Sequence, residues 1–456
     1  MPFWRKEVPN MTIQLPHPVQ TALDALNKQG YEAYVVGGCV RDFLLGKQPT
    51  DWDITTNAQP ENVLEIFSGY KTVPTGIQHG TVTIIIDDMP LEITTYRLDG
   101  AYLDGRRPET VTFTSSLQED LRRRDFTINA IAYHPTAGFT DTFSGMADLD
   151  AGRICCVGDP ERRFTEDALR ILRALRFSSV LGFSIDKITA QTIHRLAPLL
   201  RRISPERIAM ELKKLLGGKN VQQVLLEFAD VLCVVLPELQ PMIGLRQDNP
   251  YHHLTVYEHT VETVASVENT SVLRLTMLFH DCGKPNCYTR DLMGLDHFRG
   301  HPAISVILAE RAMNRLHLDK QTIRCVKTLI QHHDDTLRND DGSLLRLLHR
   351  FGPEMAHQLV QVQRADVLGQ HPDKLDRLHF LDDIDQRLTQ LVQSGACYQL
   401  ADLHITGDDL LQIGYPAGRV VGDTLLALLE EVMDGTCANE PIALQKHARE
   451  RLKNIH

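Results

Sequence analysis

The stretch GGCVRDFLLGKQPTDWDI, residues 37–54, decides the fold of the first part of the chain. It follows the apolar run Tyr34–Val36, which is typical of a buried strand, and it opens a predicted helix over Val40–Leu45. A glycine pair lets backbone amides approach a phosphate closely, and a helix N-terminus adds partial positive charge. Arg41, one turn into the helix, is placed to reach the same anion. The alternative for Gly37–Gly38 is a plain tight turn.

Three carboxylates indicate a metal site beside this turn. If residues 51–54 form a strand, Asp51 and Asp53 project from one face, with Cα atoms about 6–7 Å apart. They repel each other unless they share a divalent cation, and oxygen ligands suit Mg²⁺. Glu92, in the predicted strand Leu91–Thr95, adds a third carboxylate from a neighbouring strand. A lone D-x-D pair more often indicates an edge strand with solvated acids.

Two arginine-rich segments follow. Residues 122–124 are three arginines before an apolar turn, and Glu166–Phe177 is a predicted helix with Thr165 as its N-cap. Arginines at every third position along that helix are suited to a polyphosphate or RNA groove: Arg170, Arg173 and Arg176. The alternative is that Glu166 and Asp167 complement the helix dipole while the arginines are solvated or pair with acids.

Together these segments resemble the class II polymerase-beta-like nucleotidyltransferases, the family of CCA-adding enzymes and bacterial poly(A) polymerases. Five motifs stand in the family's order: GGCVRD at 37–42, DWD at 51–53, RRDFTINA at 123–130, the stretch 143–158 with DLDxGxI, and EDALRILRALRF at 166–177. The resemblance implies catalytic and metal-binding roles for Asp51, Asp53 and Glu92. It implies nucleotide binding by Gly38, Arg41, Arg124, Asp167, Arg170, Arg173 and Arg176.

The resemblance also implies how the base is chosen. Cytosine and adenine each present an amine donor beside a ring-nitrogen acceptor, which the carboxylate of Asp167 and the guanidinium of Arg170 can pair with. Uracil and guanine present the opposite pattern and leave both side chains mispaired, at a cost of several kcal/mol. The expected activity is addition of the 3′-terminal CCA of tRNA from CTP and ATP, with release of pyrophosphate and Mg²⁺ as cofactor.

Sibling activities share these motifs. The stretch Arg97–Pro108 is similar to the flexible loop that full CCA-adding enzymes use to switch to ATP, and no long basic tail of a poly(A) polymerase follows residue 440. A poly(A) polymerase and a CC- or A-adding enzyme therefore stay open. Two other classes also stay open: a metal phosphohydrolase whose head senses nucleotides, and an RNA-binding scaffold.

A second set of residues indicates another metal centre. His259, the dipeptide His280-Asp281 and Asp366 resemble the H…HD…D pattern of HD-superfamily phosphohydrolases over about residues 250–370. The resemblance implies four metal ligands: His259, His280, Asp281 and Asp366. It further implies His301 and His332 as candidates for a second metal, Lys284 as a phosphate contact, and Ni²⁺ or Mn²⁺ as the ion. We favour an active phosphohydrolase over a purely structural domain.

Composition sets the remaining expectations. The 456 residues carry a net charge of −11, which argues against a DNA-coating protein, although Lys and Arg outnumber Asp and Glu between residues 151 and 219. Without a long apolar run or signal-like start, and with nine scattered cysteines, we expect a cytoplasmic protein with no membrane partner and no DNA partner.

We expect an α+β protein: a polymerase-beta-like head with a mixed sheet, followed by an all-helical neck, body, HD domain and tail. After residue 150 the apolar spacing becomes helical, for example at Ala190–Leu200, Pro205–Leu216 and Val221–Val235. A break near Arg246–Asn249 and a linker at Gln370–Lys374 complete the division. The predicted domains are 12–150, 151–245, 250–370 and 375–456, the last contacting tRNA or acting as a helical cap.

Overall fold

The computed structural model describes residues 12–99 and 111–453. The chain forms two compact units whose boundary lies between Pro237 and Glu238, nine residues before the predicted break. A finer division into four domains stays a prediction. No helix within the described ranges combines the length and the apolar character that a membrane span requires.

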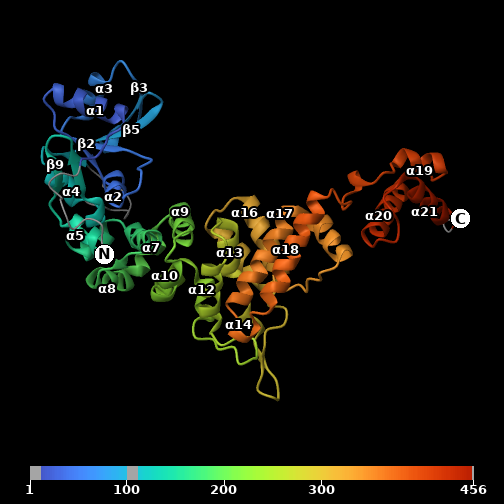
Figure 1. The fold of residues 1–456 in the computed structure, drawn as a ribbon. Coiled ribbons are helices and arrows are strands. Elements are labelled where there is room, and N and C mark those ends of the chain that lie inside the picture. The colour runs from blue at the N-terminus through green and yellow to red at the C-terminus, as the bar shows by residue number, and fades with distance from the viewer. Residues whose placement is uncertain (1–11, 100–110, 454–456) are drawn as a thin grey trace. The chain divides into compact units, whose positions relative to one another are not determined.

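The first unit contains a mixed seven-stranded sheet, as predicted. Its strand order is β3-β4-β5-β2-β1-β8-β9, and β2 runs parallel to β5 while the other neighbours are antiparallel. Helices α1 (His17–Lys28) and α3 (Pro60–Ile66) pack together over the sheet (Figure 1). The strands are β1 (Ala33–Val36), β2 (Asp53–Thr56), β3 (Lys71–Gly76), β4 (Thr81–Ile86), β5 (Met89–Thr95), β8 (Ile131–His134) and β9 (Gly138–Asp141).

The predicted strand over residues 51–54 is partly wrong, because β2 begins only at Asp53. The β1–β2 ladder pairs Ala33 with Thr56 and Val35 with Ile54. Beyond that point β1 ends and the chain turns at Gly37, which has a φ of 85°. Residue 51 therefore has no strand to pair with and lies in the bend before β2.

The helices of the first unit follow the predicted pattern with two corrections: the helix predicted to start at Glu166 begins only at Leu169, and the segment Val221–Val235 is divided into two helices. Thr165 is not an N-cap: it lies inside α6, and its hydroxyl donates to the Glu161 carbonyl at 2.7 Å. Asp159 caps α6, and the chain leaves helical geometry at Asp167 before α7 begins. The remaining helices are α2 (Gly38–Leu44), α4 (Leu117–Arg122), α5 (Gly145–Asp150), α6 (Pro160–Glu166), α7 (Leu169–Leu181), α8 (Lys187–Leu196), α9 (Pro205–Leu216), α10 (Val221–Glu227) and α11 (Ala229–Val235).

Short strands complete this unit. The pair β6 (Arg97–Asp99) and β7 (Val111–Phe113) flanks residues 100–110, so most of the predicted flexible loop lies outside the described residues. After residue 150, where we expected essentially no strands, β10 (Arg153–Ile154) and β11 (Ser184–Ile185) form a two-residue parallel pair.

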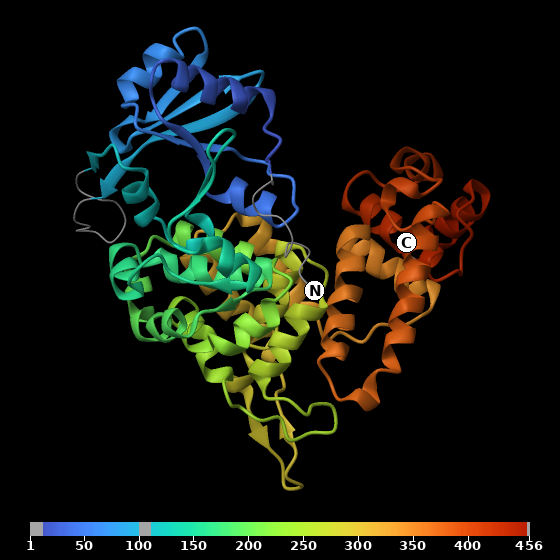
Figure 2. The same cartoon turned by 60° about the vertical axis from the view of Figure 1, so that its left-hand side comes forward.

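The second unit is helical apart from the small hairpin of β12 (Thr289–Arg290) and β13 (Asp296–His297), which projects from the helices in Figure 2. Gly352, with a φ of 76°, kinks α17 just before Pro353. The helices are α12 (Val256–Ser266), α13 (Ser271–Phe279), α14 (Lys284–Cys287), α15 (His301–Arg315), α16 (Lys320–His332), α17 (Asp341–Leu368), α18 (Arg377–Gln393), α19 (Gly407–Ile413), α20 (Arg419–Met433) and α21 (Pro441–Leu452).

The segment Gln370–Lys374 joins α17 to α18 and contains a short 3-10 helix at Pro372–Lys374. Helices on both sides of it share one apolar core: Val360 and Val367 of α17 lie with Leu381 of α18 and with residues of α19 to α21. The segment is therefore a turn between packed helices as well as the predicted connection.

Candidate active site and metal centre

The turn after β1 brings the glycine pair against a carboxylate and an arginine. A Cβ atom on Gly37 would lie 3.1 Å from Nη1 of Arg124 and 3.7 Å from Oδ2 of Asp53. The positive φ of Gly37 and this close approach both require glycine. Gly38 is the first residue of α2, and the guanidinium of Arg41 folds back to within 3.7 Å of its ideal Cβ position. The structure thus brings Gly38, Arg41, Arg124 and Asp53 into one region.

Asp53 and Glu92 stand side by side, because they are register partners on the parallel strands β2 and β5. Burial raises the pKa of Asp53 to about 6; Arg124 opposes this shift, and the negative charges of Glu92 and Asp51 add to it. Among the described residues none of these three carboxylates forms an ion pair. Crowded carboxylates that have Arg124 nearby but no ion pair are the oxygen-rich donor set that a divalent cation fits.

The segment after α4 connects this carboxylate group to α7. Asp125 is buried and accepts hydrogen bonds from the Asn129 side chain at 3.1 Å and from Nε and Nη2 of Arg173 at 2.8 and 2.5 Å. Although burial favours the neutral acid, Arg173 and Asn129 hold the pKa of Asp125 well below its usual value. Asp125, which directly follows Arg124 in the chain, therefore fixes the guanidinium of Arg173 in place.

Arg41 is held by residues from three elements. Its Nη1 donates to Asn129 at 2.7 Å, its Nε donates to Asp42 at 2.9 Å, and its guanidinium lies 5.1 Å from the ring centre of Phe177. The side chain is largely buried and points along Gly38 rather than into solvent. Its position favours the predicted contact with an anion bound at the glycine turn.

Asp167 and Arg170 are fixed in position but keep free hydrogen-bonding groups. Asp167 accepts from the backbone N–H of Leu169 at 3.0 Å and from Nη2 of Arg207 at 2.8 Å, one donor on each oxygen. Each carboxylate oxygen therefore retains a lone pair. Arg170 donates through Nη1 to Glu166 at 3.1 Å and through Nη2 to the Arg123 carbonyl at 3.0 Å, which leaves Nε free among the described contacts.

The other two predicted arginines are paired with acids. Arg173 pairs with Asp125 at 2.5 Å, and Arg176 lies 3.2 Å from Glu211 with its guanidinium 4.1 Å from the Phe177 ring centre. Both side chains thus have the acidic partners of the alternative interpretation, and nucleotide binding by Arg173 and Arg176 stays a prediction. Sequence reasoning missed the roles of Asp125, Arg207 and Glu211; Asp125 lies inside a quoted motif, but no local pattern points to the two residues of α9.

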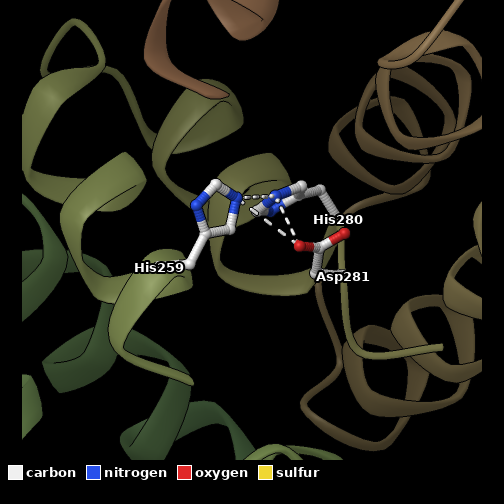
Figure 3. A group of neighbouring side chains, drawn as sticks. All are labelled: His259, His280 and Asp281. Atoms are coloured by element: carbon white, nitrogen blue, oxygen red, sulfur yellow. Dashed lines mark hydrogen bonds and ion pairs between the residues drawn. The ribbon is translucent and has the colours of Figure 1, made fainter. Parts of the chain in front are cut away.

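A second centre lies in the other unit, where the predicted histidines and aspartates converge. Nε2 of His259 lies 3.0 Å from Asp366, 3.4 Å from His280 Nε2 and 3.5 Å from Asp281. Figure 3 shows His259, His280 and Asp281. His280 Nε2 lies 3.3 Å from Asp281 and 3.5 Å from Asp366. His259, His280 and Asp281 are almost completely buried. The structure thus brings all four predicted ligands together.

Asp281 joins this group to a second one made with His301 and His333. Its Oδ1 lies 3.2 Å from His301 Nε2 and 3.9 Å from His333 Nε2. The prediction that His332 binds the second metal was wrong. Its ring points to Asp335, 2.7 Å away, whereas the next residue, His333, is buried and faces the cluster. Adjacent residues at a helix end point in different directions, so the sequence pair did not reveal which ring faces inward.

All four inward histidines present the same ring nitrogen. Their Nδ1–H groups donate to backbone carbonyls, which leaves every Nε2 facing the aspartates: His259 to Gly369 at 2.9 Å, His280 to Met277 at 2.7 Å, His301 to Phe298 at 2.9 Å and His333 to Ile330 at 2.7 Å. A Cβ on Gly369 would lie 2.7 Å from the first of these rings, so only glycine allows that contact. Carbonyl partners of this kind orient metal-binding imidazoles.

The electrostatics of the cluster also fit a cation. Burial opposes the charged imidazolium of His280, but Asp281 and Asp366 outweigh it and raise its pKa to about 10. Both oxygens of Asp281 are buried without a well-directed hydrogen bond, although Lys284 Nζ lies 2.6 Å away. A cavity of about 530 Å³ opens beside the cluster and is lined by Asp281, Lys284, His301 and Arg377 among others. The donor set fits a metal ion with space for a small ligand next to it.

Comparison with known families covers most of the chain. The "Poly A polymerase head domain" family matches residues 33–155, the family described as "Probable RNA and SrmB- binding site of polymerase A" matches residues 182–243, and the family described as "tRNA nucleotidyltransferase domain 2 putative" matches residues 304–448. The third match runs across the predicted boundary at residues 370–375.

Individual proteins are similar over nearly the whole length. A CCA-adding enzyme of Enterococcus faecalis is 34% identical over 427 residues, which cover 93% of this chain and 94% of that protein. The crystal structure of the Bacillus stearothermophilus CCA-adding enzyme in complex with CTP has a TM-score of 0.72 at 30% identity, covering 96% of this chain and 99% of that chain. A Thermotoga maritima CCA-adding enzyme complexed with tRNA shares the fold, with a TM-score of 0.62 at 19% identity over 96% of each chain.

Proposed function

The chain belongs to the CCA-adding enzymes of the poly(A) polymerase family, and from this premise we propose that it completes or repairs the 3′-terminal CCA of tRNA. It is a nucleotidyltransferase that uses CTP and ATP, needs no nucleic-acid template and releases pyrophosphate. The observations that support the proposal are the carboxylates of β2 and β5, which form no ion pair among the described residues, and the fixed side chains of Asp167 and Arg170. We propose that it acts in the cytoplasm, in keeping with a tRNA substrate.

We assign the divalent ions of the head to Asp51 and Asp53, with Glu92 beside them, and propose Mg²⁺ as the ion. When bound, such ions lower the pKa of the RNA 3′-hydroxyl and stabilise the departing pyrophosphate. The chain's own groups complete the site: the backbone N–H of Gly38 at the start of α2 and the side chains of Arg41 and Arg124 bind the triphosphate. In-line attack on the α-phosphate then joins the nucleotide to the RNA.

We propose that base choice rests on the unused hydrogen-bonding groups of two side chains. Asp167 accepts from the exocyclic amine of cytosine or adenine through a remaining lone pair, and Arg170 donates to the ring nitrogen through its free N–H. Arg207 and Glu166 hold these side chains before the nucleotide arrives. Uracil and guanine leave both groups mispaired, so they are rejected.

The test of this function supplies a tRNA lacking its last three nucleotides with each nucleoside triphosphate separately and then with all four, and sequences the RNA ends. We expect CTP alone to give two added C residues and CTP with ATP to give CCA and no more. A stop after CC, addition of A alone or a long A tail would assign one of the sibling activities instead.

The His–Asp cluster supports a second candidate function. We propose that His259, His280, Asp281 and Asp366 hold Ni²⁺ or Mn²⁺ and that the adjoining cavity accepts a small phosphoester, which Lys284 contacts. The convergent Nε2 atoms are the observation that favours this function. Purified protein supplied with either ion is expected to hydrolyse a phosphoester such as a 2′,3′-cyclic phosphate, and His280→Ala to abolish that activity. Inactive wild-type protein with every ion and ester would leave the cluster a structural element.

A further inference from the structure

A groove in the second unit is positively charged although the chain as a whole is acidic. It measures about 760 Å³ and runs along α16 to the kink of α17. Lys320, Arg324 and Arg350 line it together with Thr328, and none of the described residues that line it is acidic. In a chain with a net charge of −11, an acid-free groove with three cations is a local reversal of sign.

The cations of this groove are available to a ligand. Lys320 and Arg324 are exposed, and neither takes part in any ion pair among the described residues. Arg350 is also exposed; its guanidinium lies 4.7 Å from the ring centre of Phe351, and its Nη2 contacts His332 Nε2 at 3.3 Å. Because Asp335 accepts from the other nitrogen of that imidazole at 2.7 Å, the ring uses its Nε2 lone pair for Arg350. The arginine is thus held in place while other N–H groups stay free.

The spacing of the groove suits a chain of anions rather than one small ion. Lys320 and Arg324 stand four residues apart on α16, so their side chains lie one helical turn, about 6 Å, from each other. Both can donate to phosphate oxygens, whereas the hydroxyl of Thr328, one turn further on, already donates to the Arg324 carbonyl at 3.0 Å. A second groove of about 330 Å³ shares Arg350 and Phe351 and adds Arg338 and Arg346 against one lining acid, Asp335, so cations remain in excess beyond the end of α16.

We propose that this groove, defined by Lys320, Arg324, Thr328 and Arg350, binds the sugar–phosphate backbone of the RNA substrate. The inference rests on the proposed function for the identity of that RNA. Charge complementarity to a regularly spaced polyanion is the physical basis, and each contact releases counter-ions from the RNA. The groove fixes RNA position without reading its sequence, because phosphate contacts carry no base information.

The test compares two double variants that remove the same charge. Lys320→Gln with Arg324→Gln empties the groove of two exposed cations, while Arg311→Gln with Lys327→Gln removes two cations that do not line it. Binding of a fluorescent tRNA lacking CCA is measured by anisotropy at several salt concentrations. We expect the groove variant to bind about 10-fold more weakly and to lower the slope of log affinity against log salt by about 2. The control is expected to change affinity less than about twofold.

Turnover separates this inference from the proposed function. If the wild type adds CCA, the groove variant should raise the KM for tRNA and leave kcat unchanged. If the wild type adds no nucleotide but the groove variant alone loses RNA binding, the proposed function fails and the groove still binds RNA. Equal RNA affinities for the two double variants would overturn the inference. Loss of poly-glutamate binding with unchanged RNA binding would also overturn it and assign the groove to an acidic protein.

Discussion

The protein contains two groups of closely spaced carboxylates, and their negative charges are compensated to different degrees. In the head, Asp53 and Glu92 stand on adjacent strands without an ion pair, and the pKa of Asp53 is raised to about 6. In the His–Asp cluster, burial likewise favours neutral acids, yet His280, Lys284 and His259 hold the pKa values of Asp281 and Asp366 well below their usual range.

The opposite pKa shifts of the two carboxylate groups indicate which centre depends on a metal ion. The cluster carries its own cationic partners, so its carboxylates are compensated before any ion arrives. The head carboxylates have no such partner within ion-pair distance among the described residues. The charge of Arg124 offsets only part of the rise in the pKa of Asp53, and an external cation would relieve the remaining repulsion. The head is therefore built to bind ions in order to work, whereas the cluster keeps its structure without one.

The largest effect is expected from a substitution that disrupts only the carboxylate group of the head. Asp53→Asn should lower nucleotide incorporation by at least about 1000-fold, since it removes a carboxylate that we assign to the ions stabilising the transition state. Incorporation of CTP into truncated tRNA under single-turnover conditions measures this loss. The matched control Asp88→Asn, an exposed turn residue, should retain normal activity. Near-normal incorporation by Asp53→Asn would remove the carboxylate group from the catalytic site.

The next largest effect is expected from a substitution that disrupts only the His–Asp cluster. His280→Ala should lower the stability of the α12–α13 region by about 3 kcal/mol, because it leaves Asp281 and Asp366 without one of their buried partners. Hydrogen exchange of the α13 amides measures this local loss, and CCA addition should change less than about threefold. His332→Ala is the control, since that ring lies outside the cluster. Unchanged exchange in His280→Ala would show that the aspartates need no histidine.

Base selection gives a smaller effect within the head. Asp167→Ala should reduce the preference for CTP over UTP by about 100-fold, because the amine of cytosine loses its acceptor and uracil no longer meets a mispaired carboxylate. The ratio of kcat/KM values for the two nucleotides measures the preference. Arg207→Gln should produce a weaker change in the same direction, since Arg207 only positions the carboxylate. An unaltered ratio in both variants would place base recognition elsewhere.

The smallest effect concerns the pH dependence of head stability without metal. Because the folded state raises the pKa of Asp53 from 3.8 to about 6, ionisation destabilises the head as the pH rises through this interval. This shift corresponds to about 3 kcal/mol, which solvent screening of the partly exposed side chain reduces. Asp53→Asn should therefore be more stable by up to about 2 kcal/mol above pH 6.5 in EDTA, with no difference near pH 3. Fluorescence of the buried Trp52 in a Trp4→Phe background follows head unfolding in urea. A stabilisation that persists at pH 3 would show another cause.

Local patterns predicted those parts of the molecule in which neighbours in sequence are also neighbours in space. The bounds of α9 and the glycine turn follow from short-range rules of chain geometry. The start of β2 at Asp53 did not follow, because it depends on where β1 runs out of pairing residues. Thr165 was likewise assigned to the wrong position, since the chain breaks at Asp167 between two helices.

Long-range pairs could not be predicted from the sequence. Asp167 meets Arg207 across 40 positions and Asp125 meets Arg173 across 48, and only the packing of α7 against α9 and the head creates these contacts. In the His–Asp cluster the ligand pattern was readable, but the orientation of each ring depends on a carbonyl of the local backbone. The choice between His332 and His333 therefore needed the structure.

The most direct test of the account is a crystal structure of this protein with CTP and Mg²⁺. We predict an ion bound by Asp51 and Asp53 against the triphosphate, with the cytosine amine on Asp167 and its ring nitrogen on Arg170. A cytosine bound away from these two side chains, or the two aspartates without an ion while the nucleotide is present, would contradict it.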